Sequence, residues 1–196
     1  MLSALLVSDM FGCSGDQRYM VDWSRWLAER DFSVDTVTVN ELLPDIYPFA
    51  SDATVEYKHA CITQAAVSAR AAAALRGRIE SRSTDLLMGF SYGGYIAYGA
   101  RDALAAGAVL VCLSATRLRH VLPIESPPTV HAIFGGNDPH RPGAFGGEFF
   151  TCTELPGADH EVYRDVSACA MPVARALAGR SATPGGCGKN SSAVKY

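Results

Sequence analysis

Residues 89–93 form the pattern G-x-S-x-G, with Ser91 at its centre. An apolar segment, 84–90, ends directly before the serine, and a segment of helical character, 93–105, begins just after it. A sharp strand-to-helix turn exposes a serine hydroxyl at the edge of a sheet, and it demands small residues two positions away on either side. Gly89 and Gly93 meet that demand. Ser91 is therefore a candidate nucleophile rather than an ordinary serine in a glycine-rich turn.

A serine nucleophile needs a base, and the base needs an acid to orient it. Asp138 follows the apolar segment 129–135 in "IFGGNDPH", and His160 follows segment 149–155 in "ELPGADHE". Because the carboxyl ends of parallel strands meet at one edge of a sheet, both side chains should lie near Ser91. The order Ser, Asp, His is the one that this kind of turn requires. Asp159 and His140 are the rival acid and base.

Each candidate also has a structural alternative. Ser91 could be a turn serine, Asp138 could cap a short helix after Asn137, and His160 could be a surface histidine. Cys13 could be a reactive thiol near the site, but no base lies beside it in the sequence. The coincidence of order, spacing and sheet edge favours the catalytic interpretation.

Alternating apolar and helical segments predict the elements that would position this triad. An α/β fold is expected, with a mostly parallel six-stranded sheet flanked by helices and right-handed crossovers. The proline-rich connection 115–128 is too short for a large cap. The boundaries predicted are one domain at 1–178 and a flexible, glycine-rich tail at 179–196. Strands are predicted at 2–8, 33–39, 84–90, 108–114, 129–135 and 149–155, and helices at 16–29, 55–80, 93–105 and 161–177.

Composition limits the classes of partner. The 196 residues carry a net charge of −3, which gives no electrostatic reason to expect nucleic acid or an anionic membrane as partner. No apolar run approaches the roughly 20 residues that span a bilayer, and the N-terminus lacks the features of a signal peptide, so the expected location is the cytoplasm. The six cysteines form no zinc-like pair, so free thiols are expected and no metal. A homodimer is compatible with the sequence.

Three segments resemble the α/β-hydrolase superfamily, and most of all its small dienelactone hydrolase-like branch. These are "SDMFG" at 8–12, "GFSYGG" at 89–94 and "GADHEVYR" at 157–164, and the resemblance extends over 2–177. It implies a minimal α/β-hydrolase fold. Position by position, it implies the nucleophile Ser91, the acid Asp138, the base His160, oxyanion-hole N–H groups on Met10 and Tyr92, and substrate contacts by Asp9 and Arg164.

The implied activity is hydrolysis of a small ester, lactone or thioester through an acyl-enzyme, with no cofactor. The chain departs from the branch in having serine where true dienelactone hydrolases have cysteine, and its second substrate arginine has no clear counterpart beyond Lys58 and Arg70. Arg164 could grip a substrate carboxylate, or it could pair with Glu161 or Asp165 at the surface. Alternative functions are a thioesterase or acyltransferase acting on a carrier-bound acyl group, and a non-catalytic binding protein.

Overall fold

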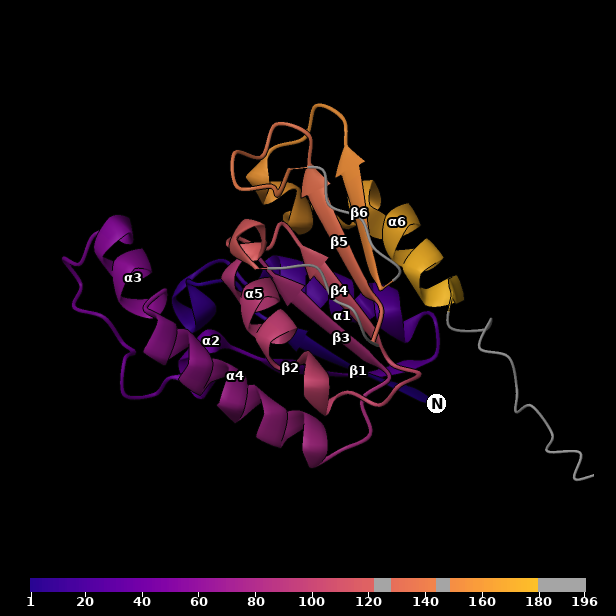
Figure 1. Cartoon of the computed structure of the whole chain (residues 1–196), viewed down its shortest axis with the longest axis horizontal. Coiled ribbons are helices and arrows are strands. Elements are labelled where there is room, and N and C mark those ends of the chain that lie inside the picture. The colour runs from indigo at the N-terminus through magenta and orange to yellow at the C-terminus, as the bar shows by residue number, and fades with distance from the viewer. Residues whose placement is uncertain (122–127, 144–148, 180–196) are drawn as a thin grey trace, which may run out of the picture.

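The computed structural model describes residues 1–121, 128–143 and 149–179. Six strands form one sheet in the order β2-β1-β3-β4-β5-β6, and every neighbouring pair is parallel (Figure 1). The predicted fold class is thereby confirmed. The strands are β1 Leu2–Val7, β2 Phe32–Val37, β3 Leu86–Phe90, β4 Val109–Leu113, β5 Val130–Gly135 and β6 Phe150–Leu155.

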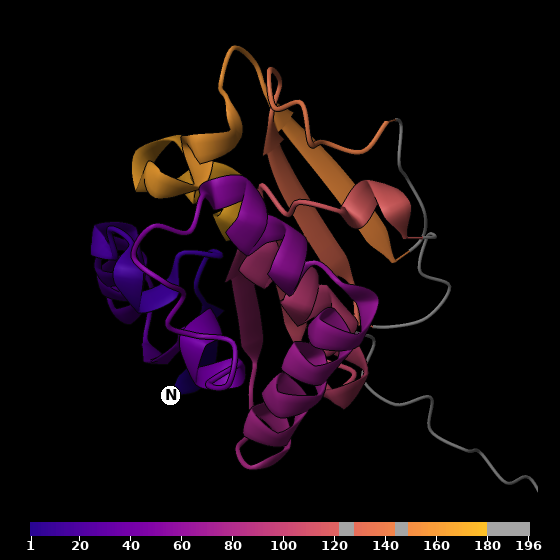
Figure 2. The same cartoon turned by 90° about the vertical axis from the view of Figure 1, so that its left-hand side faces the viewer.

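Helices cover both faces of the sheet, as a parallel sheet requires. The helix α5 lies in front of the strands in Figure 1, and Figure 2 turns α3 and α4 toward the viewer. The α-helices are α1 Arg18–Ala28, α2 Val39–Leu42, α3 Val55–Ile62, α4 Ala65–Glu80, α5 Tyr92–Gly99 and α6 Val166–Ala178. Short 3₁₀ helices lie at Gly12–Ser14, Arg101–Ala103, Leu118–His120 and His160–Arg164.

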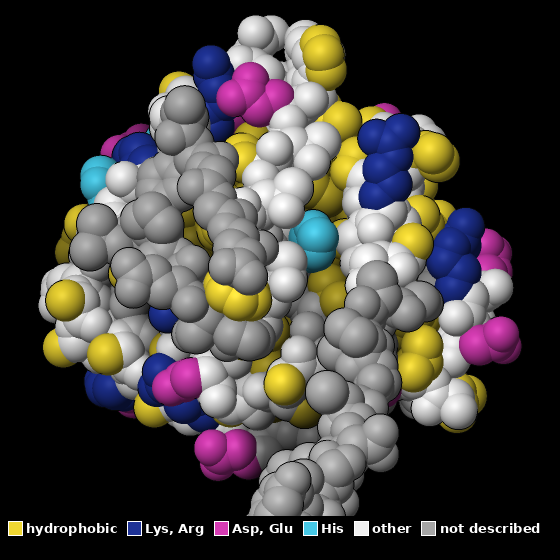
Figure 3. Space-filling view, turned by 45° about the vertical axis from the view of Figure 1, so that its right-hand side comes forward, with side chains coloured by type: hydrophobic (Ala, Val, Ile, Leu, Met, Phe, Trp, Pro, Cys, Tyr) yellow, Lys and Arg dark blue, Asp and Glu magenta, His cyan; other side chains and the backbone are white. Residues whose placement is uncertain are grey.

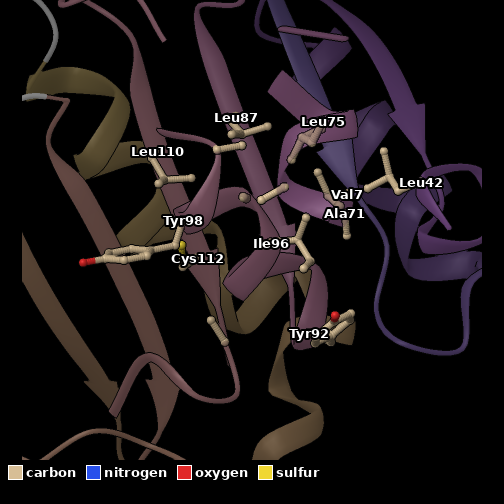
Figure 4. Close-up of a cluster of buried hydrophobic side chains, with 14 of the residues drawn as sticks. Val7, Leu42, Ala71, Leu75, Leu87, Tyr92, Ile96, Tyr98, Leu110 and Cys112 are labelled. Atoms are coloured by element: carbon tan, nitrogen blue, oxygen red, sulfur yellow. The ribbon is translucent and has the colours of Figure 1, made fainter. Parts of the chain in front are cut away.

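The central strands are buried on both sides, so their apolar residues divide between two cores. Leu5 and Val7 point into the core under α4 and α5, whereas Ala4 and Leu6 point into the core under α1 and α6. Figure 4 shows part of the first core, in which Leu75 of α4 and Ile96 of α5 pack with side chains of the strands. This double burial explains why the strands read as unbroken apolar runs.

Three predicted helices are each divided in the structure. The segment predicted at 93–105 is α5 followed by the 3₁₀ helix Arg101–Ala103. The segment predicted as one helix at 55–80 is α3 and α4, with a break at Thr63 and Gln64. The segment predicted at 161–177 begins as a 3₁₀ helix, and α6 starts only where the Asp165 carboxylate accepts hydrogen bonds from the N–H groups of Ser167 and Ala168. Pro172 lies inside α6 without dividing it, and Gly77 does not interrupt α4.

The surface carries no dominant charge on the face seen in Figure 3, where basic and acidic side chains are both scattered among other types. Among the residues described, no helix is both long and apolar enough to cross a membrane. The predicted tail, apart from Gly179, lies outside the described residues, as do parts of the loops expected at 121–128 and 137–147.

Candidate active site

Ser91 occupies a strained turn between β3 and α5. Its φ of 50° and ψ of −118° lie in a region that residues with a side chain rarely adopt. The Ser91 N–H donates to the Leu113 carbonyl at 2.8 Å, which holds the turn against β4. A Cβ atom at Gly93 would lie 2.0 Å from the Ser8 carbonyl oxygen, so only glycine lets α5 approach β1 this closely. The local geometry is that of a nucleophile elbow.

The three predicted triad residues form one chain of hydrogen bonds. Ser91 Oγ lies 3.0 Å from His160 Nε2, and His160 Nδ1 lies 2.8 Å from Asp138 Oδ2. Asp138 follows β5 and His160 follows β6, so neighbouring strand ends bring acid and base to the serine. This arrangement can remove the hydroxyl proton and stabilise the resulting imidazolium.

The carboxylate of Asp138 is fully buried and satisfied on both oxygens. His160 engages Oδ2, while the backbone N–H of His140 donates to Oδ1 at 2.7 Å. Burial alone would raise the pKa of Asp138, but the hydrogen bonds from His160 and from the His140 backbone outweigh it and lower the pKa below its usual value. Asp138 is therefore ionised at neutral pH, as an orienting acid must be.

The rival candidates do not take the predicted positions of acid, base or nucleophile. The Asp159 carboxylate accepts the Glu161 N–H at 2.9 Å and so caps the 3₁₀ helix that follows it, without contacting the His160 ring. His140 lies beside His160, with ring centroids 5.3 Å apart, but makes no hydrogen bond to Ser91. The thiol of Cys13 is exposed, and its backbone N–H donates to Asn40 Oδ1. Within the described residues, no cluster of three or more potential metal ligands is present.

The two expected oxyanion-hole donors lie at the start of α5 and just after β1. Tyr92 is the first residue of α5, so its backbone N–H has no acceptor within the helix. Met10 follows β1, and the turn that contains it is held at two points: Tyr47 Oη donates to the Met10 carbonyl at 2.6 Å, and the Phe11 N–H donates to Asp9 Oδ1 at 3.0 Å. That these N–H groups stabilise an oxyanion stays a prediction.

Asp9 and Arg164 contact each other. Asp9 is almost completely buried, and its Oδ2 accepts hydrogen bonds from Tyr163 Oη at 3.0 Å and Arg164 Nη2 at 3.1 Å. Burial raises the pKa of Asp9 despite these partners. Glu161 forms an ion pair with the same guanidinium, as the surface interpretation of Arg164 expected. A role for either residue in substrate binding stays a prediction.

A cavity of about 520 Å³ opens directly over the triad. Its wall combines apolar and titratable side chains, and neither Asp9 nor Arg164 belongs to it. Ser91, His160 and Met10 were predicted at such a site, and His140 was considered as a rival base. The lining residues that were not predicted there are Phe11, Val55, Glu56, His59, Thr116, Glu161 and Tyr163. Three of them come from the start of α3, which was expected to be part of one longer helix.

The charge state of the cavity histidines is set by their surroundings. Burial lowers the pKa of His59, and the charges of Arg117 and Arg119 lower it further. Burial and the neighbouring His160 likewise lower the pKa of His140. Both rings are therefore neutral at pH 7.

Comparison with known proteins identifies the fold. No family model matches the sequence, and no curated protein matches it. Among solved structures, a candidate dienelactone hydrolase from Klebsiella pneumoniae is similar, with a TM-score of 0.64, 15% identity, and coverage of 92% of this chain and 87% of its own.

Two further structures are similar over most of both chains. A dienelactone hydrolase-like promiscuous phosphotriesterase from metagenomic libraries has a TM-score of 0.59 and 16% identity, covering 92% of this chain and 86% of its own. A thioesterase of the prodiginine biosynthetic pathway in Streptomyces coelicolor has a TM-score of 0.55 and 13% identity, covering 91% and 90%. Together with the sheet order and the serine turn, these likenesses show that the chain has the α/β-hydrolase fold.

Proposed function

We propose that the protein hydrolyses a small ester, lactone or thioester through an acyl-enzyme on Ser91. The observation that carries the proposal is the continuous hydrogen-bonded chain from Ser91 Oγ through His160 to Asp138, with distances of 3.0 and 2.8 Å, at the floor of a cavity. The strained turn at Ser91 and the ionised, buried Asp138 support it. The hydrolases and thioesterases among similar folds agree with this class of reaction.

The chemistry follows from the geometry. His160 Nε2 takes the hydroxyl proton as Ser91 Oγ bonds to the carbonyl carbon, and Asp138 stabilises the imidazolium. The N–H groups of Met10 and Tyr92 then hold the negative oxygen, an effect typically worth about 3 kcal/mol per donor. His160 returns the proton to the departing alcohol or thiol. Water, deprotonated by the same histidine, cleaves the acyl-serine ester and releases the acid.

The same site suits an acyl group delivered on a larger carrier. Val55, on the cavity wall, is half exposed, and the described part of the β4–β5 connection holds only the 3₁₀ helix Leu118–His120, so no large cap covers the opening there. A thioesterase with this fold is among the similar structures. A carrier-linked thioesterase or an acyltransferase is therefore the second candidate; in the latter, an alcohol or thiol replaces water.

Labelling and hydrolysis test the proposal together. A fluorophosphonate probe should modify Ser91, and a short p-nitrophenyl ester should be hydrolysed. Ser91→Ala should remove labelling and lower kcat/KM by roughly 1,000-fold or more, and adding His160→Ala should cost little further. Ser51→Ala, at an exposed serine, is the control and should change neither readout.

Other outcomes assign another function. If neither labelling nor hydrolysis occurs in the folded protein, the site serves binding rather than catalysis. Full activity in Ser91→Ala with loss in Cys13→Ala would make the thiol the nucleophile. Formation of a new ester when an alcohol is added, at the expense of free acid, would identify acyl transfer.

A further inference from the structure

His140 forms a hydrogen bond to the triad residue Asp138 but has no role in the reaction proposed above. Asp138 divides its two oxygens between two histidines: Oδ2 takes the ring of His160, and Oδ1 takes the backbone N–H of His140 at 2.7 Å. This places the His140 ring edge-to-face with the His160 ring, at 5.3 Å between centroids and 85° between planes. The ring also lines the cavity over Ser91. Its side chain is thus held next to the reacting centre by the backbone.

One nitrogen of the His140 ring already has a hydrogen-bond partner. Arg119 Nη1 lies 3.2 Å from His140 Nδ1 and 3.2 Å from the His140 carbonyl oxygen. A guanidinium only donates hydrogen bonds, so Nδ1 must act as the acceptor and carry no proton. In the neutral ring the proton is then on Nε2.

The ring is also kept neutral. Burial and the charges of His160 and Arg119 lower the pKa of His140 more than Asp138 raises it. Among residues 1–121, 128–143 and 149–179, none accepts a hydrogen bond from Nε2 of His140. His140 therefore offers one N–H donor of fixed tautomer beside the cavity.

We propose that His140 determines specificity by donating its Nε2–H to an acceptor oxygen of the substrate other than the scissile carbonyl. This deepens the proposed hydrolase function and rests on it. The cavity wall also has apolar residues, among them Met10, Phe11 and Val55. The substrate class is accordingly an ester or thioester with a mainly hydrocarbon body and one ether, hydroxyl or second carbonyl oxygen close to the reacting group.

Paired esters isolate this hydrogen bond. One pair is p-nitrophenyl pentanoate and p-nitrophenyl 3-methoxypropanoate, in which an ether oxygen replaces one methylene of the acyl chain. The other pair is butyl butyrate and 2-methoxyethyl butyrate, which places the oxygen on the alcohol. The readout is the ratio of kcat/KM for the ether ester to that for the alkyl ester, so differences in intrinsic reactivity cancel between protein variants.

The variants keep or remove the donor. His140→Phe retains a ring and the backbone N–H but has no donor, and it should lower the ratio about threefold to tenfold in one of the two pairs, as for loss of one neutral hydrogen bond. His140→Gln restores an N–H donor and should recover part of the ratio. Arg119→Met removes the guanidinium that keeps the His140 proton on Nε2, and it should lower the ratio less than His140→Phe does. Arg141→Met is the matched control, since this exposed arginine pairs with Glu154, and it should leave the ratio unchanged.

The outcomes separate this proposal from the hydrolase function. An equal loss for both members of each pair would make His140 a support for Asp138 and overturn the specificity role. An unchanged ratio in His140→Phe for both pairs would overturn it as well. Failure of wild-type protein to cleave any of the four esters, with no fluorophosphonate labelling, would instead overturn the proposed hydrolase function.

Discussion

Two buried carboxyl groups near Ser91 show how residue environment sets chemical role. Asp138 and Asp9 are both almost inaccessible to solvent. Hydrogen bonds from His160 and His140 overcome burial at Asp138 and lower its pKa, whereas burial prevails at Asp9 and raises its pKa. Asp138 is therefore a fixed negative charge next to the His160 ring. Asp9 instead ties the Met10 turn to Tyr163 and Arg164 through hydrogen bonds.

The position of Arg164 gives a test at the residue scale. Its guanidinium already contacts Asp9 and Glu161 and does not line the cavity. We therefore expect Arg164→Ala to lower kcat/KM equally for a neutral ester and for its carboxylate-bearing analogue, by less than about tenfold. Steady-state kinetics on the two esters measure this. A loss of about tenfold or more confined to the anionic ester, the size of a charge-assisted contact, would place Arg164 in the substrate site after all.

The three hydrogen-bonded residues could be predicted from sequence because each follows the end of a predicted strand, Ser91 directly and Asp138 and His160 after short loops. The strand ends fix the sheet edge, and the edge brings Ser91, Asp138 and His160 together. The partners of Arg164 were left open because spacing alone does not choose between Glu161 and a substrate. His140 was considered only as a rival base. Its backbone N–H bonds the Asp138 side chain two residues before it, a common local turn that does not by itself reveal where the His140 ring lies.

At the scale of elements, the site depends on how closely α5 packs against the sheet. Gly93 lies where a methyl group would overlap the carbonyls of Ser8 and Val7 at the end of β1. Gly93→Ala should therefore destabilise the fold by about 1–3 kcal/mol, the usual cost of overpacking. It should also lower activity, because β1 leads directly into Asp9 and Met10.

Urea unfolding and ester hydrolysis measure the two effects. Gly77→Ala is the control: Gly77 is exposed inside α4 with open space around its Cβ position, so alanine there should be neutral or stabilise by up to about 1 kcal/mol. Equal stability of the two variants would show that the close approach of α5 to β1 carries little of the fold's stability.

The break between α3 and α4 explains why part of the cavity wall escaped prediction. Residues 55–80 are rich in alanine and contain no proline, so helical propensity predicts a single helix. The chain breaks where the Ile62 carbonyl accepts hydrogen bonds from the side chains of Ser68 and of Tyr92, a residue of α5. The contact with Tyr92 joins residues 30 apart in the sequence. Periodicity cannot reveal such a contact, and so His59 and its neighbours were not expected at the site.

For the whole molecule, sheet topology could be predicted more fully than loop detail. Six apolar strands with helical connections leave few arrangements that keep right-handed crossovers and bury both faces. The loops that complete the cavity obey no such rule, since Glu56, Thr116 and Glu161 reach it from three separate connections. The fold therefore fixes where the candidate catalytic residues lie, while the connecting segments determine which substrates the cavity can accept.

Acid sensitivity is a property of the whole fold that partly buried histidines impose. Burial lowers the pKa of His131, which lies on β5 and does not line the cavity, and it also lowers the pKa of His59 and His140. A histidine whose pKa is lower when folded binds its proton more readily in the unfolded chain. At these three histidines, unfolding therefore takes up protons as the pH falls through the ordinary histidine value of about 6.5, and their effect is to lower the free energy of unfolding.

We expect urea unfolding at pH 7.5, 6.5 and 5.5 to give a steadily smaller free energy of unfolding. His131→Gln removes one of the three groups without touching the cavity, so its loss of stability between pH 7.5 and 5.5 should be smaller than that of the wild type. His120→Gln, at an exposed position, should retain the wild-type dependence. Comparing how the free energy of unfolding changes with pH cancels the loss of stability that each substitution causes at a single pH.

Because a raised carboxyl pKa such as that of Asp9 acts with the opposite sign, only the difference between His131→Gln and wild type is diagnostic. Identical slopes in these two proteins would show that His131 is equally free to bind a proton in the folded and unfolded states.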